Sequence, residues 1–201
     1  MMLRRRHLGP ALVAFVVCVP VAIAGPARAP GFSGDRKAVA LVAQANRSYA
    51  RVPAVRVDAV VFDTSFRFTL FLRNGVTWAE QAQVRTDDGE FTIVGTVDGG
   101  SFVKDSGASC WRFVPKSDPQ AMEDLGGPVL AGPGRLGRPR TVAGTIEIIA
   151  TQQGGERMRI VLDRRTLRLK RVTYLSARGN MTARFTTLAA APPLPATQPR
   201  C

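Results

Sequence analysis

The segment 90–114 most constrains the fold, because its apolar and polar residues alternate and tight-turn residues interrupt it. Phe91 and Ile93 can share one face of a strand. An Asp-Gly-Gly turn can then reverse the chain, and a second turn leads to Trp111 and Phe113. The segment therefore predicts consecutive antiparallel strands with one large apolar face.

The rest of the chain adds strands of the same kind. Asn74-Gly75 is the strongest hairpin signal, and it joins an alternating segment at 66–72 to a strand that contains Trp78. Glu80 falls on the same face as Trp78, which predicts either a bulge or a polar spot in the apolar face. Further alternating segments follow at residues 145–149, 157–162, 167–174 and 181–186, and the apolar phase shifts at Lys170-Arg171, as a second bulge would require.

Two helices are expected. Apolar residues at intervals of three and four between 38 and 52 form one stripe, which Ser33 or Asp35 can cap and Pro53 ends. A short helix is predicted near 118–125, after an Asp-Pro pair. The glycine- and proline-rich segment 128–139 is expected to be a loop, either functional or merely solvated.

About nine strands and two helices define the fold class. A flat sheet of that many strands would expose its apolar face, so it must curl, and the helices are the only available cover. The sequence predicts an α+β fold: a strongly curved antiparallel sheet, an unclosed half-barrel, covered by helices.

The ends of the chain have their own signatures. Residues 1–24 resemble a secretory signal peptide, with a basic start, an apolar run and small residues; a retained anchor is the less favoured alternative. We expect a linker at 25–34, one domain at 35–188 and a disordered Ala/Pro-rich tail at 189–201. The protein is expected to be exported to the periplasmic or extracellular side of the cell envelope.

Two cysteines remain after such a cleavage. Cys110 and Cys201 either pair in the oxidising compartment, or Cys110 is a small buried residue and Cys201 a mobile terminal thiol.

Several kinds of chemistry have no residues to support them. The only histidine, His7, lies in the predicted signal peptide, so no histidine base or metal ligand remains. No nucleophile elbow, phosphate-binding glycine loop or Cys-x-x-Cys pair occurs. We therefore expect no enzyme, no metal and no cofactor.

The net charge of +13 favours anionic partners. The basic residues between 157 and 171 alternate with apolar residues, as on the wet side of a half-buried sheet, and the few aromatic residues fall on the opposite face. A stacking platform for single-stranded nucleic acid is thus missing. We expect no nucleic-acid partner, and favour a solvated surface or one that faces an anionic membrane.

The order of these features resembles a known superfamily. A signal peptide precedes a helix ending in Ala-Asn-Arg-Ser-Tyr; strands with Asp-Gly turns follow, then a Trp-Arg-Phe-x-Pro strand end, a short helix and a Leu-Asp-Arg-Arg-Thr-Leu-Arg-Leu-Lys-Arg-Val segment. This order is similar to that of the periplasmic lipoprotein carriers (LolA-like, LppX-like and RseB-like proteins) over residues 35–188.

The resemblance implies an unclosed barrel with a helical lid around an apolar cavity for acyl chains. The residues at matching positions that would line the cavity are Leu41, Val42, Tyr49, Phe68, Leu70, Trp78, Phe91, Ile93, Trp111, Phe113, Met122, Leu125, Ile146 and Ile148. The partner would be a lipid or an acylated lipoprotein, bound by a monomer. The alternative is an envelope sensor or regulatory module of the same fold that acts through a protein partner.

Overall fold

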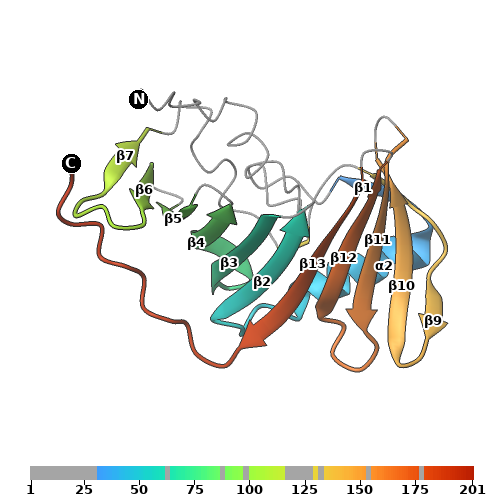
Figure 1. Ribbon diagram of the computed structural model, residues 1–201. Coiled ribbons are helices and arrows are strands. Elements are labelled where there is room, and N and C mark those ends of the chain that lie inside the picture. The colour runs from blue at the N-terminus through green and yellow to red at the C-terminus, as the bar shows by residue number, and fades with distance from the viewer. Residues whose placement is uncertain are drawn as a thin grey trace.

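The computed structural model describes residues 31–61, 64–86, 89–96, 100–115, 129–130, 134–152, 155–176 and 179–201. The predicted signal peptide and the predicted short helix near 118–125 lie outside these residues. Within the described part, one helix accompanies a single sheet of thirteen strands (Figure 1).

The elements follow one another along the chain. They are β1 (Phe32–Gly34), α2 (Arg36–Arg47), β2 (Ala54–Val61), β3 (Thr64–Arg73), β4 (Val76–Thr86), β5 (Gly89–Thr96), β6 (Ser101–Asp105), β7 (Arg112–Val114), β8 (Gly134–Leu136), β9 (Arg140–Val142), β10 (Thr145–Thr151), β11 (Arg157–Asp163), β12 (Leu169–Ser176) and β13 (Gly179–Leu188).

The strands are hydrogen-bonded in the order β1-β8-β10-β11-β12-β13-β2-β3-β4-β5-β6-β7, and β9 pairs with the edge of β10. Only β1 and β8 run parallel; the other pairs are antiparallel. The order does not return to its start, so the sheet is unclosed. The predicted antiparallel, unclosed sheet is confirmed. Of the two helices predicted to cover it, α2 is described, and the second lies outside the described residues.

The strand register defines two faces, because directly paired residues lie on the same side of a sheet. The helix face contains the apolar cross-strand row Phe185, Val57, Phe68, Ala82, Ile93 and Val103. The opposite face, which we call the outer face, carries the residues next to these in each strand. Its cross-strand row is Thr186, Arg56, Thr69, Gln81, Val94, Phe102 and Phe113. The core of the protein lies on the helix face, against α2.

Helix α2 begins as the sequence predicts, because the Asp35 carboxylate accepts a hydrogen bond from the Ala38 N–H at 3.0 Å. Its buried stripe is Ala38, Val42 and Ala45. The helix is shorter than predicted: it ends at Arg47, and Tyr49 follows in a turn. There the Tyr49 hydroxyl accepts a hydrogen bond from the Leu169 N–H at 3.0 Å, which ties the turn to β12.

Both predicted bulges are present. The register of β3 and β4 shifts between Phe71 and Leu72, which leaves Trp78 as an extra residue on β4. The register of β11 and β12 shifts between Val161 and Leu162, which leaves Lys170 as an extra residue on β12. Each bulge changes which later side chains face α2.

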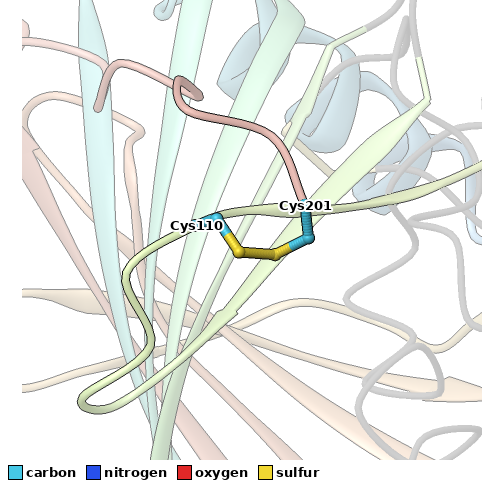
Figure 2. The surroundings of a disulfide bond; sticks show 2 residues. All are labelled: Cys110 and Cys201. Atoms are coloured by element: carbon cyan, nitrogen blue, oxygen red, sulfur yellow. A yellow bond between two sulfur atoms is a disulfide. The ribbon is translucent and has the colours of Figure 1, made fainter.

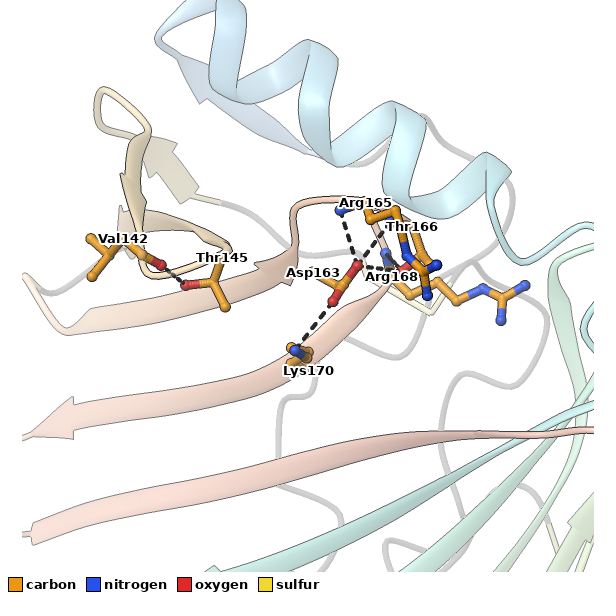
Figure 3. A network of polar contacts seen from close by, with 7 residues as sticks. All are labelled: Val142, Thr145, Asp163, Arg165, Thr166, Arg168 and Lys170. Atoms are coloured by element: carbon orange, nitrogen blue, oxygen red, sulfur yellow. Dashed lines mark hydrogen bonds and ion pairs between the residues drawn. The ribbon is translucent and has the colours of Figure 1, made fainter.

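The turn between β11 and β12 is organised by Asp163 (Figure 3). Its carboxylate accepts the backbone N–H groups of Thr166 at 2.8 Å and Arg165 at 3.0 Å, and Lys170 lies 3.2 Å away. The Thr166 N–H, followed by Lys170, holds the pKa of Asp163 well below its usual range. The bulge residue Lys170 thus also secures this turn.

Two segments expected to lack regular structure contain strands. Phe32–Gly34, assigned to a linker, forms β1, and Gly134–Leu136, inside the predicted loop, forms β8. The two pair in parallel. Gly34 adopts φ +106°, and a Cβ there would overlap the Leu136 carbonyl oxygen, so only glycine allows the pairing. Single-sequence patterns miss such three-residue strands because the partner lies a hundred residues away.

The C-terminal tail was predicted to be disordered, but its end is attached to the sheet. In Figure 1 it runs from the end of β13 to the neighbourhood of β7. Cys201 forms a disulfide with Cys110 (Figure 2), and the Trp111 N–H donates to the Pro199 carbonyl at 2.9 Å. The Arg200 guanidinium lies 4.9 Å from the Phe102 ring centroid. Of the two alternatives for the cysteines, pairing is the one observed.

Candidate functional site

The candidate site is the apolar helix face. Nine residues predicted to line it do belong to it: Val42, Tyr49, Phe68, Leu70, Ile93 and Ile148 are buried in its core, and Leu41, Phe91 and Ile146 pack half-buried against them. They come from α2, the turn after it, and β3, β5 and β10. The sheet thus brings together apolar residues that are more than a hundred positions apart.

Three predicted lining residues lie elsewhere. Phe113 pairs with Phe102, which places it on the outer face, where it is 49% exposed. Trp111, two residues earlier, lies on that face beside Lys104, whose ammonium is 5.8 Å from its ring centroid. Trp78 is the extra residue of its bulge and packs edge-on against Phe71.

The positions of these three residues away from the helix-face core have a common physical reason. The side-chain period of a strand is two, so a bulge or a turn of one additional residue moves the following side chains to the other face. Alternation shows which side chains of one strand share a face. It does not show which face the side chains of the next strand take after a turn. The remaining two predicted lining residues, Met122 and Leu125, lie outside the described residues.

Helix α2 is also hydrogen-bonded to the segment at Leu130, next to the helix face. The Asn46 side chain donates from Nδ2 to the Leu130 carbonyl at 2.7 Å and accepts the Leu130 N–H at 3.0 Å. These two hydrogen bonds hold Leu130 and its neighbour Val129 in the core, where both are almost fully buried. The sequence assigned these residues to a loop and offered no signal for the contact, which joins positions 84 residues apart.

Several polar side chains among the described residues lie in the apolar interior. Glu80 pairs with Leu70 and Thr77 with Leu72, so both lie on the helix face, and Tyr174 lies there beside Met158 and Met181. The Thr77 and Tyr174 hydroxyls are buried without a hydrogen-bond partner, and no described group bonds to the Glu80 carboxyl. Burial raises the pKa of Glu80 to about 7. The polar spot anticipated from the sequence at Glu80 therefore exists.

The described residues contain no group of three or more His, Cys, Asp or Glu side chains placed to hold a metal ion. In the same part of the chain, no helix is both long enough and apolar enough to cross a membrane.

The outer face differs in character, because arginines recur along its cross-strand rows. Near its centre they are paired: Asp58 contacts Arg67 at 2.7 Å and Arg56 at 3.2 Å, and Glu90 contacts Arg85 at 3.2 Å. A hollow of about 480 Å³ lies over this region. Toward the β9–β11 edge a second hollow, of about 410 Å³, is lined by four arginines.

Comparison with known proteins yields structural likeness without sequence kinship. No known protein family and no curated protein matches the sequence. An uncharacterized conserved protein from Thermus thermophilus superposes with a TM-score of 0.50 at 10% identity, over 78% of this chain and 90% of its own. That likeness is one of fold alone.

Two further solved structures carry more specific names. LprF from Mycobacterium bovis has a TM-score of 0.46 at 13% identity, over 82% of this chain and 99% of its own. A LolA superfamily protein from Nitrosomonas europaea has a TM-score of 0.34 at 9% identity, over 76% and 94% of the two chains. The architecture of this chain, as described above, is an unclosed sheet with a helix against its apolar face.

Proposed function

We propose that this protein is a non-enzymatic carrier of the cell envelope, which binds the acyl chains of a lipid or lipoprotein between the helix face and its cover. The observation that carries the proposal is the extent of the helix face. Its apolar rows cross nine strands from β10 to β6, roughly 40 Å at the usual strand spacing.

The cover supplied by α2 is much smaller. A helix of 12 residues is about 18 Å long and about 10 Å wide. The rest of the apolar face must be covered by other parts of the chain or by a bound molecule, since exposed apolar area of that size is unfavourable in water. Acyl chains are long, flexible and apolar, and they would complete such an interior.

The unpartnered polar groups support a ligand with a polar end. Buried hydroxyl and carboxyl groups that lack partners destabilise a fold unless something satisfies them. The Thr77 and Tyr174 hydroxyls are such groups within the helix face, and Glu80 is a buried carboxyl on the same face. An ester or hydroxyl of a lipid could hydrogen-bond to them while its chains occupy the apolar rows.

The alternative is an envelope sensor or regulatory module of the same fold. The low exposure of its central side chains favours it, because Phe66, Phe68 and Leu70 are at most 6% exposed. In that case the interior is filled by the chain's own residues, and a protein partner binds the surface.

The test is lipid capture by the exported protein. Native mass spectrometry and lipid extraction, followed by titration with a fluorescent fatty acid, should detect a bound acyl lipid. Phe91→Glu places a charge on the helix face at a half-buried position and should abolish uptake. Phe113→Glu makes the same change on the exposed outer face and should leave uptake intact.

The outcomes separate the two functions. Lipid bound by the wild type and by Phe113→Glu, but not by a folded Phe91→Glu, supports the carrier. A wild type that is free of lipid and takes up no fatty acid rules the carrier out and favours the regulatory module.

A further inference from the structure

The hollow at the β9–β11 edge, which we call the arginine pocket, has an unusual charge balance. It is lined by Arg138, Arg140, Arg157 and Arg159, with Glu147 as its one acidic residue and Gly137 and Ile149 completing the wall. Arg159 and Ile149 are directly paired across β11 and β10, as are Glu147 and Arg140 across β10 and β9. The sheet therefore fixes the residues in register.

Among the described residues, no arginine of this pocket lies within ion-pair distance of a carboxylate. The four ion pairs among the described residues involve Asp58, Glu90 and Asp163, and none involves a residue of the arginine pocket. The Nε atom of Arg159 is buried without a hydrogen-bond partner. The central hollow of the same face is different, because Asp58 and Glu90 there both contact arginines.

Four arginines around one carboxylate leave an excess of three positive charges. Like charges held together are unfavourable unless an anion neutralises them, and guanidinium groups present several N–H donors that match phosphate oxygens in pairs. A buried donor without a partner, such as the Arg159 Nε, is stabilised when an oxygen reaches it.

We propose that the arginine pocket is a binding site for a phosphate group, either a free phosphate or the phosphomonoester head of a lipid. The pocket is lined by outer-face residues, whereas acyl chains would occupy the helix face. The inference is therefore independent of the proposed carrier function and holds for either candidate function.

The experiment measures binding of defined phosphates. Inorganic phosphate and pyrophosphate are titrated into the exported protein by calorimetry at low salt and neutral pH. In a second arm, flotation measures binding to phosphatidylcholine vesicles that contain phosphatidic acid, or phosphatidylglycerol adjusted to equal charge. The variant is Arg140→Gln/Arg157→Gln, which removes two exposed pocket charges. The control is Arg164→Gln/Arg165→Gln, which removes two exposed charges from the turn between β11 and β12.

We expect the pocket variant to lose at least about tenfold in affinity, the usual effect of removing a charge-assisted hydrogen bond, while the control stays close to wild type. Pocket-dependent binding of phosphatidic acid in preference to phosphatidylglycerol identifies a lipid head as the ligand; pocket-dependent binding of the soluble phosphates alone identifies a free phosphate. Equal loss in both variants would show general attraction to a basic surface and overturn the proposal, as would no binding of any probe.

Discussion

At the scale of single residues, Glu80 is the least expected feature, because a carboxyl group lies in an apolar interior without a described partner. Burial raises its pKa from 4.5 to about 7, so the folded protein holds a proton that the unfolded chain releases between these pH values. The free energy of unfolding should therefore fall as pH rises from about 4.5 to about 7, by up to ~3 kcal/mol. Urea denaturation at several pH values measures this.

The matched control for that prediction is Glu80→Gln, which keeps the shape of the side chain and removes its charge. The variant should lack this part of the pH dependence and be more stable than wild type at pH 8. Identical pH profiles for the two proteins would contradict the burial of an unpaired carboxyl.

At the scale of elements, the C-terminal tail is held by the Cys110–Cys201 disulfide, which spans 91 positions of sequence. Closing a loop of that length restricts the unfolded chain, and removal of such a bond costs typically 2–4 kcal/mol. Trp111 is only 5% exposed, and its backbone bonds to Pro199 and Cys201. Cys201→Ser in a Trp78→Phe background should therefore destabilise the protein and shift the Trp111 emission toward that of a solvated indole.

The double variant Cys110→Ser/Cys201→Ser is the control for that prediction, since it lacks the same bond and contains no free thiol from the pair. It should behave like the single variant. An unchanged emission spectrum in both would mean that the hydrogen bonds and the Arg200–Phe102 contact hold the tail without the disulfide.

At the scale of the whole molecule, the two faces of the sheet should act separately. Phe91 belongs to the helix face, whereas Arg140 and Arg157 line the arginine pocket. Effects of substitutions that share no contact partners usually add. Phe91→Glu should therefore leave phosphate affinity unchanged, and Arg140→Gln/Arg157→Gln should leave fatty-acid uptake unchanged. Reduced phosphate affinity in Phe91→Glu, or reduced fatty-acid uptake in Arg140→Gln/Arg157→Gln, would contradict this separation and indicate coupling through the sheet.

The sequence by itself determined the longer strands, the Asn74-Gly75 hairpin turn and the start of the helix, because each depends on neighbours within a few residues. The Asn74-Gly75 turn has positive φ at both residues, as a hairpin of this kind needs, and Asp35 caps α2. Nine of the fourteen residues predicted to line a cavity lie in the core of the helix face or against it, and whether they line a cavity stays a prediction.

Only the tertiary structure decided how those local elements meet. It placed Trp111 and Phe113 on the outer face, joined Asn46 to Leu130, paired β1 with β8 and brought the end of the chain to Cys110. The tertiary structure also brings together the four arginines of the pocket, which come from separate segments of the sequence. Alternation shows which side chains of one strand share a face. Which face that is after a bulge or turn, and which distant strand pairs with it, depend on the register of the sheet, so neither is encoded in the local pattern.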